Sequence, residues 1–174
     1  MCCEETANLH FGQNWDIHWH NGCKMPTEAQ YLHMIINKTS VLPRLCVRLI
    51  AAIAGEDPIE MINYVEQLGA AFQIQDDLIA IKSEIYAKER GILAEDIHEG
   101  KRTLMVSYAY YKSDTISEQE KERLLEILDM GTEDETILRE AINILHKSGS
   151  VEYAEERART MLEKAWARLE KTIP

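Results

Sequence analysis

Several features that mark secreted, membrane or disulfide-stabilised proteins are missing from this sequence. Its 174 residues include four cysteines, none of them spaced as C-x-x-C, so we expect free thiols in a reducing cytosol. The most apolar run, residues 45–54, is too short to span a bilayer and contains Arg48. The acidic N-terminal segment lacks the basic region of a signal peptide. We therefore predict a soluble, cytoplasmic protein without a transmembrane segment.

Positive charge is also scarce. The chain has 19 Lys and Arg residues against 30 Asp and Glu, which gives a formal net charge of −11. This balance argues against a nucleic-acid partner, because the phosphate backbone selects for basic surfaces, but it leaves open a cationic ligand such as a divalent metal. With 45% hydrophobic and 28% charged residues, the composition is that of a globular protein. We predict one domain over residues 1–174.

The alternation of apolar and polar residues that marks strands is missing as well, and the chain instead carries repeated helix start signals. Each signal has a capping side chain followed within three residues by a Glu or Gln. The signals are found at Thr27–Gln30, Asp57–Glu60, Ser117–Glu120 and Thr132–Glu135. We therefore predict an all-α fold.

The helix that begins at Thr27 is expected to continue to about Ala54, where a glycine follows. Pro43 lies inside it and lacks the N–H group that would bond the carbonyl of Thr39. We expect a kink there that leaves one carbonyl free beside Lys38. A packing kink without a chemical role is the alternative.

Other boundaries are marked by glycine and serine. Residues 148–150 are expected to separate the last two helices, and residues 91–100 to form a loop. Residues 1 to about 20 also have a helical pattern, which closes at Asn21-Gly22. Because this first helix has no cap in front of it, the sequence looks like a fold entered halfway.

The stretch FQIQDDLIAI, residues 72–81, places two adjacent carboxylates in an apolar run. At about 100° per residue, Gln73, Asp76, Asp77 and Ala80 project within roughly 100° of one another on a helical wheel. An exposed acidic turn is one interpretation. The alternative is a pair of hard oxygen ligands for Mg²⁺, which takes one or two carboxylates and completes its shell with water and substrate phosphate.

Apolar residues ahead of this stretch predict how it is oriented. Met61, Val65, Leu68 and Phe72 follow the 4-3-4 spacing of a buried helical stripe. The stripe continues toward Asp76. We therefore expect Asp76 to lie close to the core rather than in solvent.

Four motifs follow one another along the chain: GQNWDI at 12–17, NKTSVL at 37–42, LGAAFQIQDDLIAI at 68–81 and EDIHEGKRTL at 95–104. In this order they resemble the motifs of the trans-type prenyl diphosphate synthases, the family of farnesyl and geranylgeranyl diphosphate synthases. The segment ARTMLEKAWARLE at 158–170 also resembles the last helix of the family. The resemblance covers essentially this whole chain but only the C-terminal half of a family member. It implies a partial isoprenoid-synthase helical bundle, the back half of that fold.

The resemblance implies a reaction in isoprenoid biosynthesis, the head-to-tail condensation of an allylic diphosphate with isopentenyl diphosphate. In this family, Mg²⁺ ions held between two Asp-rich helices draw the diphosphate away from the allylic carbon. Asp76 and Asp77 match the first two acids of the second Asp-rich motif and are the expected metal ligands. Ala80 stands where that motif usually has its third acid, and Glu84, one turn further along, is a possible substitute.

The same resemblance assigns substrate contacts. Lys38 and Lys101 match lysines that hold the allylic diphosphate, while Thr39 and Gln73 match polar groups near the developing cation. Lys38, Thr39 and Gln73 are thus the expected catalytic residues, and Lys38, Gln73 and Lys101 the expected substrate-binding residues. These residue types suit the chemistry, because a departing diphosphate gains negative charge and a carbocation needs an apolar pocket with a few fixed dipoles.

The first Asp-rich motif and the basic residues that bind isopentenyl diphosphate have no counterpart in the sequence. One hypothesis is therefore a subunit of a split, heteromeric synthase whose partner chain supplies the first motif. The alternatives are a non-catalytic regulatory subunit of a full-length synthase and a helical interaction domain without chemistry. A lone half-fold is expected to expose its interface and self-associate. Product chain length is not predicted, since upstream residues largely set it in this family.

Overall fold

The computed structural model describes residues 1–20, 24–82 and 93–171, and all regular secondary structure in these residues is helical. The predicted all-α fold is therefore confirmed. In chain order the helices are α1 (Cys2–His20), α2 (Glu28–Lys38), α3 (Val41–Ala54), α4 (Ile59–Lys82), α6 (Glu95–His98), α7 (Leu104–Tyr111), α8 (Glu118–Met130), α9 (Glu135–Lys147) and α10 (Ser150–Leu169).

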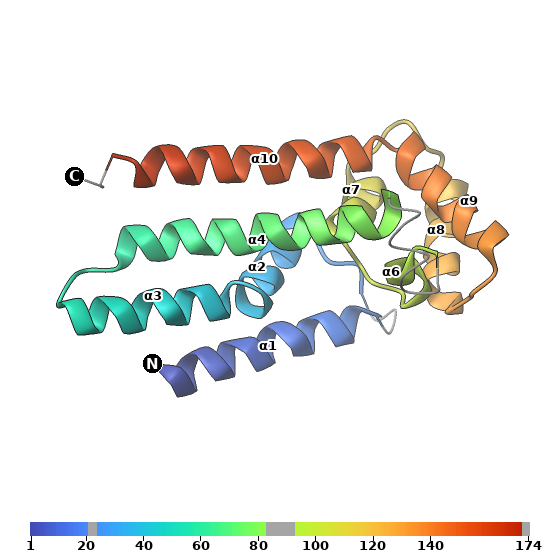
Figure 1. The fold of residues 1–174 in the computed structure, drawn as a ribbon. Coiled ribbons are helices and arrows are strands. Elements are labelled where there is room, and N and C mark those ends of the chain that lie inside the picture. Colours follow the sequence, from blue (N-terminus) through green and yellow to red (C-terminus); the bar gives the residue numbers. More distant parts are fainter. Residues whose placement is uncertain (21–23, 83–92, 172–174) are drawn as a thin grey trace.

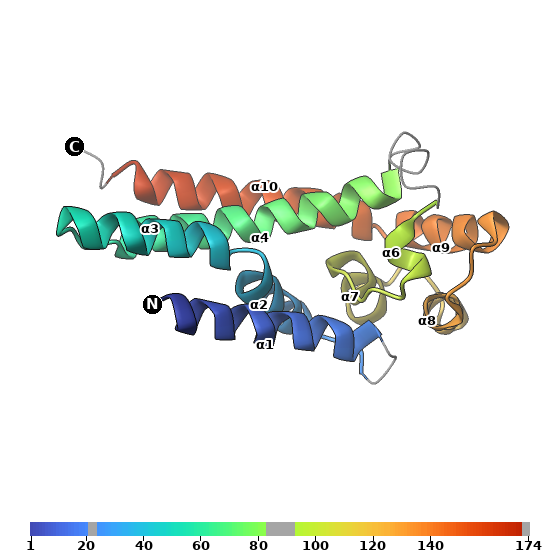
Figure 2. The same ribbon diagram turned by 60° about the horizontal axis from the view of Figure 1, so that its bottom comes forward.

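The long helix α4 is at the centre of the molecule. It packs most extensively on α10, which runs antiparallel to it, and also contacts α2 and α3 (Figure 1). Figure 2 shows α1 and α2 on one side of the layer made by α4 and α10. The short helices α6 to α9 gather at the C-terminal end of α4. No described helix is long and apolar enough to cross a membrane.

The apolar core is one cluster built from α1, α2, α4 and α6 to α10. Burial of each large side chain contributes about 1.5–3 kcal/mol to folding. The largest fully buried side chains that α4 and α7 to α9 contribute are Ile74, Leu78, Leu104, Met105, Leu124, Ile127, Leu128, Leu138 and Leu145.

The predicted helix start signals are mostly confirmed. Thr27 and Ser117 each form a complete capping box, with Gln30 and Glu120 as the reciprocal partners. The start predicted at Thr132 is wrong by two residues. There the Thr132 hydroxyl accepts the N–H of Asp134 in the preceding turn (3.1 Å), and the Asp134 carboxylate caps the helix by accepting the N–H of Thr136 (2.8 Å).

The single helix predicted from Thr27 to Ala54 is wrong, because the chain breaks at residues 39–40 into α2 and α3. Pro43 lies in the first turn of α3, where its missing N–H group costs little. The kink predicted at Pro43 is therefore replaced by a full break that precedes it. Ser40 in the break donates a hydrogen bond to the carbonyl of Glu66 at 2.9 Å, and a Cβ on Gly69 would lie 2.4 Å from Ser40 Oγ. Glycine is thus required where α4 crosses the break.

The buried stripe predicted on α4 is also wrong. Val65 is buried, but Met61, Leu68 and Phe72 are exposed, Phe72 by 67%. The face that is buried carries small residues because α10 and the break between α2 and α3 approach it closely. It consists of Val65, Gly69, Ala70, Ala71, Ile74, Asp77, Leu78, Ala80 and Ile81.

A buried ionic cluster fastens α1 to the neighbouring helices. Glu5 is 1% exposed, and its carboxylate accepts hydrogen bonds from Arg44 Nε at 2.9 Å and from Arg48 Nη1 at 2.6 Å. Arg44 also donates to Glu66 on α4 at 2.8 Å. Because a buried charge without its partner is strongly destabilising, this cluster fixes the position of α1 against α3 and α4.

Some predictions fall wholly or partly on residues that the structure does not describe. The predicted loop at 91–100 contains the short helix α6, and residues 91 and 92 lie outside the described residues. The helix end predicted at Asn21-Gly22 and the substitute acid Glu84 also lie outside them. The separation of the last two helices at 148–150 is confirmed, since Ser148 ends α9 and Gly149 precedes α10.

Candidate functional site

Four of the predicted site residues meet at one small cavity near the C-terminal half of α4. Its volume is about 30 Å³. Lys38 comes from the end of α2, Gln73 and Asp77 from α4, and Lys101 from the segment between α6 and α7. The complete lining is Asp16, Tyr31, Met34, Ile35, Lys38, Gln73, Asp77, Lys101, Arg102 and Thr103.

A chain of hydrogen bonds orients the polar groups of this site. Thr39 Oγ1 donates to Gln73 Oε1 at 2.7 Å, and Gln73 Nε2 donates to Asp77 Oδ1 at 2.9 Å. Tyr31 Oη donates to the other carboxylate oxygen of Asp77 at 2.6 Å. The helix break at residues 39–40 places Thr39 beside α4, so the predicted polar residues Thr39 and Gln73 are in direct contact.

The carboxylates of the site lie close enough to repel one another. Burial, followed by the charge of Asp96, raises the pKa of Asp77, although hydrogen bonds from Tyr31 and Gln73 oppose the rise. Burial also raises the pKa of Asp96, against the charge of Lys101, while the negative charges of Glu99 and Asp76 raise it further. Additional positive charge at this place would relieve the repulsion.

Both predicted lysines are held by carboxylates. Lys38 Nζ forms an ion pair with Asp16, and Lys101 Nζ pairs with Asp96 and, at 2.9 Å, with Glu99. Burial lowers the pKa of Lys101, but the charges of Asp96 and Glu99 outweigh burial and raise it above its ordinary value. Lys101 is therefore fully charged at neutral pH.

Several residues of the site were not predicted from the sequence, among them Asp16, Asp96 and Tyr31. Asp16 lies in the GQNWDI motif and Asp96 in EDIHEGKRTL, so both were within recognised motifs, but neither was assigned a role. Only the fold shows that Asp16 pairs with Lys38 and Asp96 with Lys101. Tyr31 had no signal in the sequence, because nothing in α2 indicates that its hydroxyl meets a carboxylate 46 residues away.

The two adjacent aspartates lie in different environments. Asp77 is 5% exposed, while Asp76 is exposed to solvent, so the prediction that Asp76 lies near the core is wrong. The reason is the α4 orientation described above, in which Gln73 and Tyr31 compensate the burial of Asp77. Ala80 is buried, 4% exposed, so an acid there would enter the core rather than join Asp76 in solvent.

These residues fit a shared Mg²⁺–diphosphate site better than a metal cage made of protein alone. Among the described residues no group of three His, Cys, Asp or Glu side chains is arranged to hold a metal ion. However, Mg²⁺ needs only one or two carboxylates when substrate phosphates and water complete its shell. Asp76 offers an open carboxylate, and each Asp77 oxygen has acceptor capacity beyond its one hydrogen bond.

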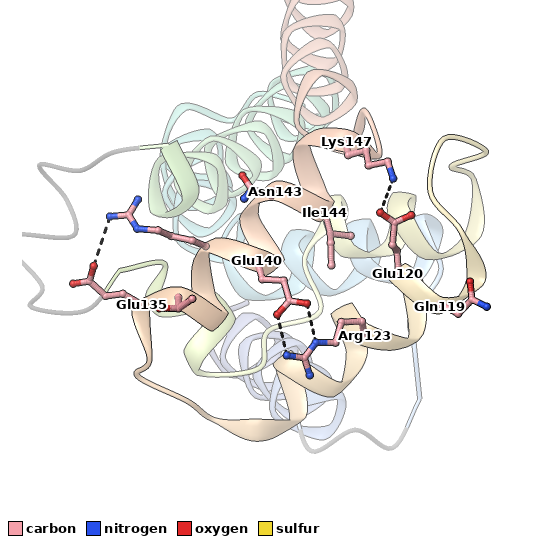
Figure 3. Close-up of a pocket in the computed structure, with 10 residues that line it drawn as sticks. Gln119, Glu120, Arg123, Glu135, Glu140, Asn143, Ile144 and Lys147 are labelled. Atoms are coloured by element: carbon pink, nitrogen blue, oxygen red, sulfur yellow. Dashed lines mark hydrogen bonds and ion pairs between the residues drawn. The ribbon is translucent and has the colours of Figure 1, made fainter.

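A larger cavity of about 680 Å³ lies between α8 and α9, away from the predicted residues (Figure 3). Each basic residue that lines it is already paired with a carboxylate. The pairs are Arg123 with Glu140 (2.9 Å), Lys147 with Glu120 (2.6 Å) and Arg139 with Glu135 (3.6 Å). This cavity is therefore lined by paired charges and by none of the predicted site residues.

Comparison with known proteins agrees with the fold and the motifs. Residues 1–145 match the family described as polyprenyl synthetase, and the chain therefore belongs to this family. It is 37% identical over 166 residues to a geranylgeranyl pyrophosphate synthase of Penicillium shearii, which covers 95% of this chain and 42% of that protein. A geranylgeranyl pyrophosphate synthase of Aspergillus flavus is 33% identical, over 93% of this chain and 46% of its own length.

Solved structures give the same result for the fold. The geranylgeranyl pyrophosphate synthetase of Pyrococcus horikoshii superposes with a TM-score of 0.80 and 28% sequence identity, over 97% of this chain and 50% of that one. A polyprenyl synthase of Roseobacter denitrificans, at 24% identity, has a TM-score of 0.83. The chain spans less than half the length of the curated relatives it matches.

Proposed function

We propose that this chain is a subunit of a split, heteromeric prenyl diphosphate synthase. It supplies the second Asp-rich motif and the lysines that hold the allylic diphosphate during Mg²⁺-dependent condensation with isopentenyl diphosphate. The observation that carries this proposal is the convergence of Lys38, Gln73, Asp77 and Lys101 on one cavity from separate parts of the chain. Family membership, with relatives that are geranylgeranyl pyrophosphate synthases, supports it.

The lysines act on the leaving group. As the allylic carbon–oxygen bond breaks, the diphosphate gains negative charge, and preplaced ammonium groups stabilise this transition state more than the ground state. Lys38 and Lys101 would exchange their present carboxylate partners for diphosphate oxygens. Mg²⁺, held by Asp76 and Asp77, would supply further neutralisation of the same oxygens.

Thr39 and Gln73 act on the allylic carbon, where positive charge develops as the carbon–oxygen bond breaks. An allylic cation is stabilised by fixed dipoles whose negative ends point toward it, in a place from which water is excluded. The 2.7 Å hydrogen bond between Thr39 and Gln73 holds the two oxygen atoms together. The hydrogen bond from Gln73 Nε2 to Asp77 fixes the amide orientation.

A second wall is required because one wall cannot exclude water from a carbocation, and in this proposal a second polypeptide supplies it. Apolar side chains on α3 and α4 that the described residues leave uncovered support a partner at this position. The most exposed are Leu42, Ile50 and Ile53 on α3, the last by 88%, and Phe72 on α4. We propose that a chain with the first Asp-rich motif covers this apolar face, which we define as Leu42, Leu49, Ile50, Ile53, Leu68 and Phe72.

A reconstituted complex tests the proposal. The chain is copurified with its partner from the native host, and transfer of labelled isopentenyl diphosphate to an allylic diphosphate is measured. Asp76→Ala is expected to abolish transfer in the complex. Asp114→Ala, an exposed aspartate in the loop between α7 and α8, is the matched control and is expected to leave transfer unchanged. Full activity of the Asp76→Ala complex contradicts the proposal.

A regulatory or purely interacting role is the second candidate. It is favoured by Ala80 in place of the third acid and by the lack of a three-carboxylate metal cluster in the described residues. In that case the partner is a complete synthase, and Asp76→Ala and Lys38→Ala leave the activity of the complex at its wild-type level. Substitutions on the apolar face would then be the ones that change activity, by releasing the subunit.

A further inference from the structure

Thr103, the residue that precedes α7, has an unusual side chain. It is 4% exposed, and its hydroxyl is the only buried side-chain polar atom among the described residues without a hydrogen-bond partner. A threonine at this position usually accepts a hydrogen bond from an N–H group of the first helical turn, but Thr103 makes no such bond. A buried hydroxyl left unpaired is unfavourable, which points to a partner that binds there.

Thr103 lines the small cavity of the candidate site together with Lys38 and Lys101. The start of α7 favours an anionic oxygen beside Thr103. The first N–H groups of α7 have no partner within the helix and form its positive end. Arg102, 5% exposed, also lines the cavity, but its guanidinium is already bound to the carbonyl of Gly100 (2.8 Å) and to Asp129.

The size of the cavity limits what reaches Thr103. About 30 Å³ admits one oxygen-sized group and excludes a whole phosphate. A single oxygen atom of a larger anion fits, with the rest of that anion outside among the two lysines. A lone water molecule also fits by volume, and the variants below distinguish it from the oxygen of an anion.

We propose that Thr103 is a further substrate-binding residue, whose hydroxyl donates a hydrogen bond to one oxygen of the diphosphate held by Lys38 and Lys101. The start of α7 adds its positive end to the same oxygen. The inference rests on the proposed function and deepens it. It assigns the leaving group a neutral donor in addition to the lysines and the metal.

Binding of inorganic diphosphate in the presence of Mg²⁺ to the full chain, measured by calorimetry, tests this inference. Thr103→Val removes the hydroxyl at nearly constant shape and is expected to weaken binding by about tenfold or more, the loss of one hydrogen bond to a charged group. Thr103→Ser keeps the hydroxyl and is expected to bind within about threefold of the wild type. Thr103→Ala takes the place of the valine variant if that variant does not fold.

Ser107→Ala is the matched control, because this buried hydroxyl on α7 already donates to the carbonyl of Pro26 at 2.9 Å. It is expected to lower the unfolding temperature without changing diphosphate affinity. Thr103→Val is expected to have the opposite pattern, with an unfolding temperature in the absence of diphosphate that is equal to the wild type or higher. A lower unfolding temperature of Thr103→Val with unchanged affinity would assign the cavity to a fixed water and overturn the inference.

Lys38→Ala separates failure of this inference from failure of the proposed function. If the wild type binds diphosphate in a Lys38-dependent way but Thr103→Val binds equally well, the role of Thr103 alone is wrong. If the wild type does not bind diphosphate at all, both the proposed site and the proposed role of Thr103 are wrong.

Discussion

At the scale of single residues, hydrogen bonds and ion pairs between side chains organise the site. Asp77 is buried between Tyr31 and Gln73, and Lys38 is held by Asp16. The sequence motifs predict which residues form the site. They do not predict that Asp77 rather than Asp76 is buried, because this depends on the rotation of α4. Helices from distant parts of the chain set that rotation by packing on α4.

Asp16 gives a pH dependence of stability. Burial raises its pKa, but hydrogen bonds and charge from His20 and Lys38 outweigh burial and lower it from 3.8 to about 2. The unfolded chain therefore takes up this proton first. The stabilisation is present above about pH 4 and is lost as the pH falls through about 2. It amounts to about 2 kcal/mol at neutral pH.

Urea unfolding between pH 2 and 5 measures this effect, and Asp16→Asn is expected to flatten that part of the stability curve. Asp114→Asn, at an exposed position, serves as the control and is expected to leave the curve as in the wild type. An Asp16→Asn curve that falls as steeply as the wild type over this range would show that the ion pair with Lys38 does not form.

At the scale of helices, the sequence predicts helix starts that depend on neighbouring residues, but not features that depend on contacts between distant helices. The capping boxes at Thr27 and Ser117 lie within a few residues of chain and are as the sequence indicates. The break at residues 39–40 was missed because the residues on either side of it have helical patterns. It is stabilised by a contact across the fold, the hydrogen bond from Ser40 to the carbonyl of Glu66.

Gly69→Ala tests the contact between α4 and the break. The added Cβ would lie 2.4 Å from Ser40 Oγ and 2.9 Å from Ser40 Cα, so backbone must move. We expect a loss of about 2 kcal/mol in the free energy of unfolding, from urea denaturation, despite the higher helix propensity of alanine. The backbone shift would also move Thr39 away from Gln73. We therefore expect the transfer rate of the complex to fall by more than the loss of folded protein alone explains. A variant as stable as the wild type would contradict the packing described here.

At the scale of the whole molecule, the described residues leave the apolar face on α3 and α4 uncovered. The 4-3-4 stripe on α4 was expected to be buried, and its exposure is the largest difference between the sequence-based prediction and the structure. The periodicity correctly identified an apolar face. It did not identify what covers that face, since the pattern is the same whether the partner is another helix of this chain or a second polypeptide.

Charge on this face is expected to change association but not folding. For the chain alone we predict self-association, and Ile50→Glu with Ile53→Glu should reduce it, because both side chains are exposed on α3. Sedimentation velocity gives the association state, and the unfolding temperature should stay within a few degrees of the wild type. Met130→Glu, at an exposed position at the end of α8, is the control. A wild-type chain that is a monodisperse monomer would argue against an interface here.

The central claim is that this chain provides the diphosphate-holding wall of a prenyltransferase, and the turnover number of the reconstituted complex tests it most directly. Lys38→Ala is expected to lower the turnover number about 10²–10³-fold, as for loss of one preorganised charge that stabilises a leaving group. Lys164→Ala, at an exposed position on α10, should leave it unchanged. A Lys38→Ala complex that turns over at the wild-type rate would contradict the account, because the chemistry would then lie entirely in the partner.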